Sequence, residues 1–99
     1  MPAFQTTPRF DRDWKGLTAA ARDRFRHVIK EEFVPDLAEG RFRPQLRVKP
    51  VKSAPGAWEM TWSWNPDGRA TFEHGQPQRS GQRHIIWRRI GGHEVFHNP

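Results

Sequence analysis

The spacing of the apolar residues changes near Arg41, and this change limits the folds that the chain can adopt. Before it, apolar side chains recur three and four residues apart, as on one face of a helix. After it, they alternate with polar side chains, as the two faces of a strand require. Helices followed by strands are typical of an α+β domain, in which the helices cover one face of an antiparallel sheet.

The first part of the chain predicts a short strand and a short helix. Residues 3–7 form the candidate strand. Phe10, Trp14 and Leu17 then follow at i, i+4 and i+7, which places them on one face of a helix that ends near Gly16.

A longer helix should begin after Thr18, whose hydroxyl can cap it. Its apolar face is formed by Ala21, Phe25, Val28, Ile29 and Phe33. Pro35 either ends this helix or begins one further turn through Leu37, which Gly40 would close. Both endings agree with the sequence.

Residues 46–52 alternate between apolar and basic side chains. We expect a strand in which Leu46 and Val48 face the core while Arg47 and Lys49 face the other way. The segment 57–64 alternates more clearly. One face would carry Trp58, Met60, Trp62 and Trp64, and the other Glu59, Thr61 and Ser63.

Two more strands are expected, at residues 69–74 and 83–90, with a polar, exposed loop at 75–82 between them. In the last strand, Ile86 and Ile90 would share a face with Arg88. Ile85 and Trp87 would share the other face with Arg89. Because both faces are partly apolar, we expect the second face to be covered by the C-terminal tail, the loop or a partner.

The elements therefore predict the order β-α-α-β-β-β-β in one domain, residues 1–99. Its two N-terminal helices should pack on one face of a twisted, mainly antiparallel sheet of four or five strands. A chain of 99 residues is large enough for one core and too small for two.

Composition excludes several classes of protein. The chain has no cysteine, so it has neither disulfides nor a thiolate zinc site. No apolar run is long enough for a membrane span or a signal peptide, which predicts a soluble, cytoplasmic protein. Residues 41–99 hold ten basic and four acidic side chains, whereas residues 1–40 hold seven of each. The net charge of +6 therefore predicts an anionic partner for the second part.

Several segments, in this order and spacing, resemble the RelE/ParE toxin superfamily of type II toxin–antitoxin systems. They are residues 10–17, 46–49, 58–62 and 89–96. Most RelE-like members of this superfamily are ribosome-dependent mRNA interferases. The resemblance implies a RelE-like fold and an endoribonuclease with no metal and no cofactor. It also implies three partners: a cognate antitoxin, mRNA and the ribosome. An antitoxin segment would be one candidate to cover the second face of the last strand.

The resemblance also implies roles for particular residues. Arg89 and His93 match an arginine and a histidine that YafQ-like members place four residues apart. Arg89 would neutralise phosphate charge, and His93 would act as acid or base. Glu59 lies where YoeB-like members could place a carboxylate base, although it could equally balance Arg47 or Arg89. The residues expected to bind RNA are Arg47, Lys49, Lys52, Arg88 and Phe96, the last by stacking on a base.

Other readings remain open at this point. Arg47 and Lys49 also suit an ordinary solvated strand face. His74, His93 and His97 lack metal-ligand spacing, so we expect no metal site. A ParE-like toxin that inhibits gyrase would have the same architecture and would not need His93. A non-catalytic nucleic-acid-binding relic of the fold would also explain the charge and the aromatic residues.

Overall fold

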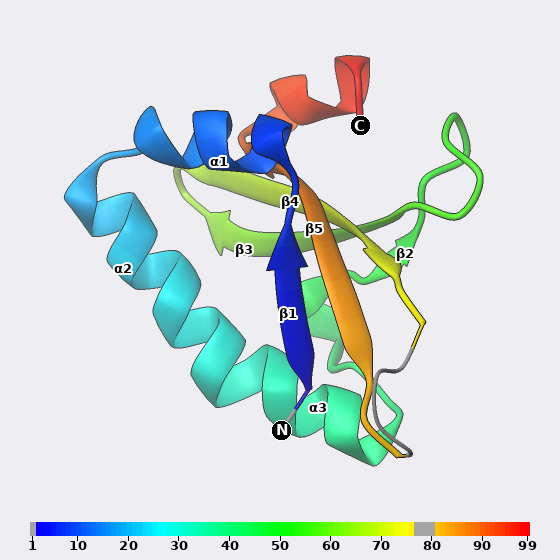
Figure 1. Ribbon diagram of the computed structural model, residues 1–99. Coiled ribbons are helices and arrows are strands. Elements are labelled where there is room, and N and C mark those ends of the chain that lie inside the picture. Colours follow the sequence, from blue (N-terminus) through cyan, green and yellow to red (C-terminus); the bar gives the residue numbers. More distant parts are fainter. Residues whose placement is uncertain (1, 77–80) are drawn as a thin grey trace.

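A mixed sheet with the strand order β1-β5-β4-β3-β2 forms the centre of the computed structural model, which describes residues 2–76 and 81–99 (Figure 1). Residues 77–80 of the expected loop lie outside this part. The elements are β1 (Ala3–Thr6), α1 (Pro8–Lys15), α2 (Ala19–Val28), a π-helical turn (Ile29–Phe33), α3 (Val34–Glu39), a 3-10 turn (Pro44–Leu46), β2 (Lys49–Pro50), β3 (Trp58–Trp64), β4 (Asp67–His74), β5 (His84–Gly91) and a C-terminal 3-10 helix (His93–His97).

Local capping explains where the first two helices begin. The Thr7 hydroxyl accepts a hydrogen bond from the backbone N–H of Phe10, and Pro8 stands at the first helical position of α1. Thr18 caps α2 in the same way through the N–H of Ala21. Both helix starts therefore follow the sequence prediction.

The long helix does not end at Pro35. A π-helical turn leads from α2 into α3, and the N–H of Val34 bonds the carbonyl of Ile29. Pro35 then lies in the first turn of α3, where its missing N–H costs little. Gly40 closes α3 at φ 76°, a left-handed conformation that glycine adopts without strain. Of the two endings, the structure has the further turn.

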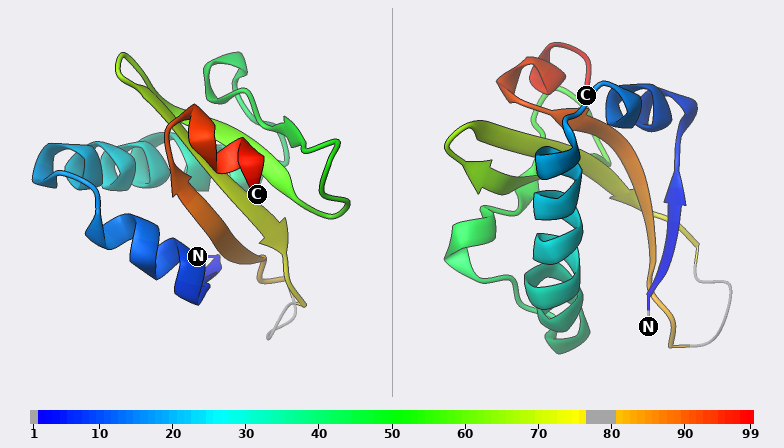
Figure 2. Two further views of the ribbon diagram at one scale, coloured as in Figure 1. Left: turned by 90° about the horizontal axis from the view of Figure 1, so that it is seen from above. Right: turned by 90° about the vertical axis from the view of Figure 1, so that its left-hand side faces the viewer.

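The sheet joins the two ends of the chain. β1 runs parallel to β5, with Ala3 opposite His84 and Thr6 opposite Trp87. β5, β4, β3 and β2 are antiparallel neighbours. α2 lies along one face of this sheet (Figure 2), so the predicted arrangement of helices on one face of a mainly antiparallel sheet is confirmed.

Aromatic rings fill the layer between the helices and the sheet. Phe25 and Phe33 each lie 5.3 Å, ring centre to ring centre, from Trp87 of β5. Phe33 also contacts Phe72 of β4 edge-on at 5.5 Å. The buried residues are Phe10, Phe25, Val28, Phe33, Leu37, Leu46, Met60, Trp62, Ala70, Phe72, Ile85, Trp87 and Ile90. Burial of this apolar surface is the main contribution to stability.

The prediction that Ile90 shares a face with Ile86 and Arg88 is wrong. Arg89 pairs with Thr71 but Trp87 pairs with the next residue of β4, so Arg88 is an extra residue in a β-bulge. The bulge reverses the alternation, and Ile90, only 2% exposed, joins the core face.

The predicted strand 46–52 is mostly wrong. Only Lys49 and Pro50 pair with β3, and Leu46 ends a 3-10 turn that begins at Pro44. Arg47 follows at φ 47°, in the left-handed region, which interrupts an extended chain. Leu46 is nevertheless buried, as expected.

The apolar face of β3 is partly as predicted. Met60 and Trp62 are buried, but the register shifts between Thr61 and Ser63, and Trp64 is 57% exposed. Thr61, expected on the polar face, is buried, and its hydroxyl has no hydrogen-bond partner in the described part of the chain. No helix among the described residues is long and apolar enough to cross a membrane.

An ion pair fixes the segment that leaves α3. The Asp36 carboxylate accepts hydrogen bonds from the guanidinium of Arg43 at 2.8 and 3.0 Å, and from its backbone N–H at 2.9 Å. These hydrogen bonds from Arg43 hold the pKa of Asp36 below its usual 3.8. The charged form of Asp36 therefore stabilises the fold.

We predict that Asp36→Ala lowers the free energy of unfolding by about 1–2 kcal/mol at pH 7. Since the pKa is depressed in the folded state, this contribution is complete above pH 3.8 and is lost as the pH falls further. Chemical denaturation at pH 7 and pH 3 measures both effects. Asp23→Ala, which removes an exposed pair with Arg26, is the control and should change stability by less than about 0.5 kcal/mol. An equal loss in the two variants would contradict the prediction.

Candidate functional site

The sheet face opposite the helices carries a network of charged side chains. Glu59 lies opposite Thr71 and Thr61 lies opposite Arg69, so these residues of β3 and β4 share this face. Arg69 donates to Asp67 at 2.8 Å and lies 4.0 Å from Glu59. Lys49 of β2 lies 3.7 Å from the same Glu59 carboxylate. The partners of Glu59 are thus Lys49 and Arg69, and the expected pairing with Arg47 or Arg89 is wrong.

The sequence analysis missed Arg69, although its side chain is only 14% exposed and lies at the centre of this network. The signal was present in the alternation of Arg69, Thr71 and Glu73 with Ala70 and Phe72 along β4. That alternation places the three polar residues on the face away from the helices. The strand was predicted, but its polar face was not examined for function.

The C-terminal tail, residues 92–99, folds back onto this face. Its 3-10 helix lies against β4 and β5 (Figure 2), and Val95 anchors it with no exposed surface. The guanidinium carbon of Arg69 lies 5.9 Å from the centre of the Phe96 ring. The His93 ring meets the Phe96 ring edge-on at 5.2 Å. The tail thus brings His93 and Phe96 to the network around Arg69.

Glycine is required where the tail turns back. A Cβ atom on Gly91 would lie 2.6 Å from a carboxylate oxygen of Glu94, far inside van der Waals contact. The same oxygen accepts a hydrogen bond from the N–H of Gly92 at 2.9 Å. The Gly91-Gly92 pair therefore allows the carboxylate to fix the turn that presents His93.

Arg89 does not approach His93 as a free cation. Its guanidinium donates to both carboxylate oxygens of Asp13 in α1, at 2.6 and 3.2 Å, and to the carbonyl of Asn98 at 2.9 Å. Asp13 also accepts the N–H of Ile90 at 3.1 Å. Arg89 thus ties α1 to β5 and to the tail.

The other predicted basic residues lie in different places. Arg88 donates to Glu73 at 2.7 Å and to the carbonyl of Pro99 at 3.1 Å. Arg47 lies over the ring of Trp64, 5.6 Å from its centre, near the β3–β4 hairpin. Lys52 is exposed in the turn after β2, and no carboxylate in the described residues pairs with it. Of the predicted site, the structure joins His93, Phe96, Glu59 and Lys49 into one line of contacts through Arg69.

The remaining histidines have structural surroundings. His84 is buried, and its Nδ1 lies 3.1 Å from the carbonyl of Gln76. The His74 ring packs edge-on against Trp58 and Phe72. This burial, and to a lesser extent the charge of Arg83, lowers the pKa of His74 below its usual 6.5. Across residues 2–76 and 81–99, no three acidic or histidine side chains gather as a metal site would require.

The charged face combines groups suited to acid–base chemistry on an anion. His93 is exposed, so its imidazole is accessible to a substrate. Arg69 supplies positive charge close to it, and Phe96 supplies an aromatic surface between the two. A proton carrier beside a cation is what cleavage of a phosphodiester requires.

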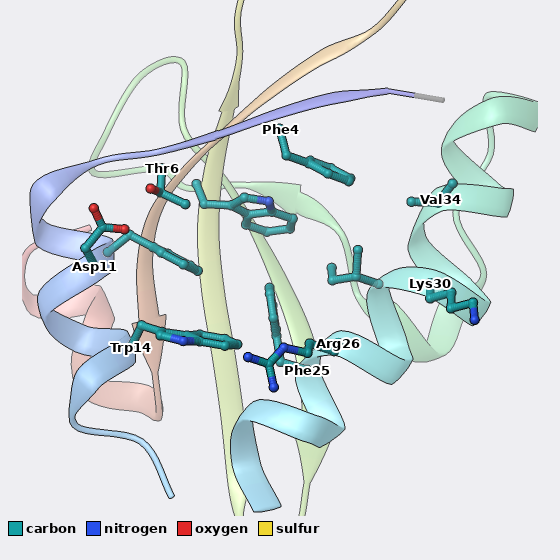
Figure 3. Close-up of a pocket in the computed structure, with 11 residues that line it drawn as sticks. Phe4, Thr6, Asp11, Trp14, Phe25, Arg26, Lys30 and Val34 are labelled. Carbon is teal, nitrogen blue, oxygen red and sulfur yellow. The ribbon is translucent and has the colours of Figure 1, made fainter. Parts of the chain in front are cut away.

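A second surface feature is an apolar groove on the helix side, enclosed by β1, α1 and α2. Phe4, Trp14 and Phe25 point into it (Figure 3), and its cavity volume is about 590 Å³. Phe4 is 41% exposed, which is unusual for a large apolar side chain beside the core. Arg26 and Lys30 of the long helix add positive charge to its lining.

Comparison with known proteins gives a fold and no close relative. No protein-family profile matches the chain, and no curated protein sequence matches it. Among solved structures, a chain of the E. coli DinJ–YafQ complex matches with a TM-score of 0.61 and 15% identity, over 96% of this chain and 97% of that one. YafQ from E. coli strain BL21(DE3) matches with a TM-score of 0.60 and 14% identity, over the same shares. A second structure of the E. coli DinJ–YafQ toxin–antitoxin complex matches with a TM-score of 0.61 and 14% identity, over 95% of this chain and 94% of that one. The chain therefore has the RelE-like fold of the YafQ toxin.

Proposed function

We propose that this chain is the toxin of a type II toxin–antitoxin system and an endoribonuclease that cleaves mRNA without a metal, on the ribosome. One observation carries the proposal. On a YafQ-like fold, the tail presents His93 and Phe96 beside Arg69 on an open, charged sheet face. The ParE-like reading would leave this arrangement of imidazole, ring and guanidinium without a use.

The proposed reaction uses the 2′-hydroxyl of the RNA as nucleophile. Its oxygen forms a bond to the adjacent phosphorus while the bond from phosphorus to the 5′-oxygen breaks. The products are a 2′,3′-cyclic phosphate and a 5′-hydroxyl end. One proton leaves the 2′-oxygen and one reaches the 5′-oxygen, and His93 performs one of these transfers.

Positive charge stabilises the phosphorane that develops between bond formation and bond cleavage. Arg69 is the nearest guanidinium to the Phe96 ring in the described contacts and is assigned this role, with Lys49 beside it. Glu59 holds both cations through its carboxylate, which makes it a positioning residue in this proposal. Phe96 has no hydroxyl and stacks on a base. Arg47 and Lys52, at the edge near β2, would attract the RNA backbone.

We predict that His93→Ala lowers the rate of mRNA cleavage by about 100-fold or more, because a positioned acid or base contributes roughly 10²–10⁴. Purified protein is mixed with translating ribosomes, and cleavage is mapped by primer extension. His97→Ala is the matched control, since His97 is exposed on the same 3-10 helix. It should change the rate by less than about twofold.

Two results would refute this assignment. Cleavage by His93→Ala at the wild-type rate would remove the residue from the mechanism. Absence of cleavage by the wild-type protein, together with induction of DNA damage in cells, would favour a gyrase inhibitor instead.

The cognate antitoxin is the proposed occupant of the apolar groove. β1 is an edge strand beside the groove, so an extended segment can pair with it and place apolar side chains against Phe4 and Trp14. Arg26 and Lys30 would favour acidic residues flanking that segment. The groove lies on the helix side of the sheet, away from His93, so antitoxin could be held there independently of RNA.

We predict that Phe4→Glu weakens antitoxin binding by at least tenfold, because it places a charge in an apolar contact. The small open reading frame adjoining the gene is coexpressed, and the affinity of the purified partners is measured by calorimetry. Trp64→Ala is the control, since Trp64 is an exposed aromatic outside the groove. If both substitutions leave the affinity unchanged, the antitoxin does not use the groove.

A further inference from the structure

Donors from three elements converge on the last two carbonyl oxygens of the tail. Arg9 of α1 and Arg89 of β5 both donate to the carbonyl of Asn98. Arg88 of β5 donates to the carbonyl of Pro99 at 3.1 Å, and the hydroxyl of Thr71 in β4 donates to the same oxygen at 3.3 Å. Terminal residues usually fray unless something holds them. Here three arginines and a threonine hold these two oxygens.

The local charge exceeds what these carbonyls need. Arg12 lies with Arg9, Arg89 and Asn98 around an adjoining hollow of about 200 Å³. The acidic side chains facing this cluster are Asp13, which pairs with Arg89, and Glu73, which pairs with Arg88. Four guanidiniums thus stand against two carboxylates, and Arg9 has only a neutral oxygen as its hydrogen-bond partner. Arginine forms its strongest hydrogen bonds with anionic oxygens.

We propose that Arg9, Arg12, Arg88, Arg89 and Thr71 form a phosphate subsite for the RNA backbone, and that the Asn98 and Pro99 carbonyl oxygens occupy the place of phosphate oxygens. That the ligand is RNA rests on the proposed function. The subsite binds a phosphate flanking the cleaved one. Val95 is fully buried, so residues 98 and 99 can leave the subsite while His93 and Phe96 keep their positions.

An intramolecular occupant lowers the apparent affinity for RNA. The RNA must displace the two tail residues first, so the observed dissociation constant is the intrinsic one divided by the fraction of molecules with an open subsite. Removing the tail residues should raise that fraction to one. A tail that carries a negative charge should lower it.

The test measures binding without cleavage. The probe is a fluorescent single-stranded 2′-O-methyl RNA, which has no 2′-hydroxyl to attack the phosphate, and its anisotropy reports the affinity. A chain ending at His97 should bind about three- to tenfold more tightly than residues 1–99. Pro99→Glu, which adds a carboxylate to the tail, should bind several-fold more weakly. This second variant tests the proposal even if the shortened chain does not fold.

Substitution of the arginines identifies the subsite. In the shortened chain, Arg9→Ala and Arg88→Ala should each weaken binding and reduce the slope of log affinity against log salt by about one. Arg24→Ala is the charge-matched control, because Arg24 is exposed on α2. Equal effects of Arg9→Ala and Arg24→Ala would overturn the proposal, as would unchanged affinity in both tail variants.

Failure of the subsite can be told apart from failure of the proposed function. Tail-dependent binding of the 2′-O-methyl RNA, without cleavage of mRNA by the wild-type chain, would refute the endoribonuclease and leave the subsite. Cleavage that depends on His93, with binding that ignores the tail, would refute the subsite and leave the endoribonuclease.

Discussion

The indole of Trp87 is the contact on which the rest of the structure depends. It lies in β5, beside both β1 and β4, and its ring contacts the rings of Phe10, Phe25, Phe33 and Phe72 at 5.3–6.3 Å. Those four rings come from α1, α2, the π-helical turn and β4. One side chain therefore joins both helices to the sheet, and loss of its packing would release the layer that supports the charged face.

The β-bulge that follows Trp87 connects this core to the candidate site. Because Arg88 is an extra residue in β5, Trp87 and Ile90 both face the helices, although they are three residues apart. The two arginines between them are then directed to groups outside the core, namely Glu73, Asp13 and the tail. A regular strand would have placed Ile90 on the charged face. The bulge thus builds the core and the basic cluster with the same four residues.

How much the sequence predicted depended on whether a signal was local. Thr18, Gly40 and the helical spacing around Phe25 and Phe33 act within one element, so the helices were predicted well. The bulge at Arg88 depends on pairing with β4, which no local pattern records. The strand at Leu46 was overcalled because alternation alone did not register the left-handed Arg47. The site residues came from resemblance to a family, and they remain predictions; Arg69 was missed since its role depends on the tail folding back.

The charge asymmetry of the sequence acquires a different meaning on the folded chain. It predicted a face of free cations, but Arg69, Arg88 and Arg89 each have a carboxylate partner. An RNA phosphate would therefore have to replace or share these partners, which makes binding an exchange of anions. Such an exchange gains less affinity than binding to free cations would, and it favours a ligand whose phosphates match the spacing of the guanidiniums. The face is thus better suited to recognising one backbone geometry than to holding any polyanion, as a site that must order RNA before cleaving it requires.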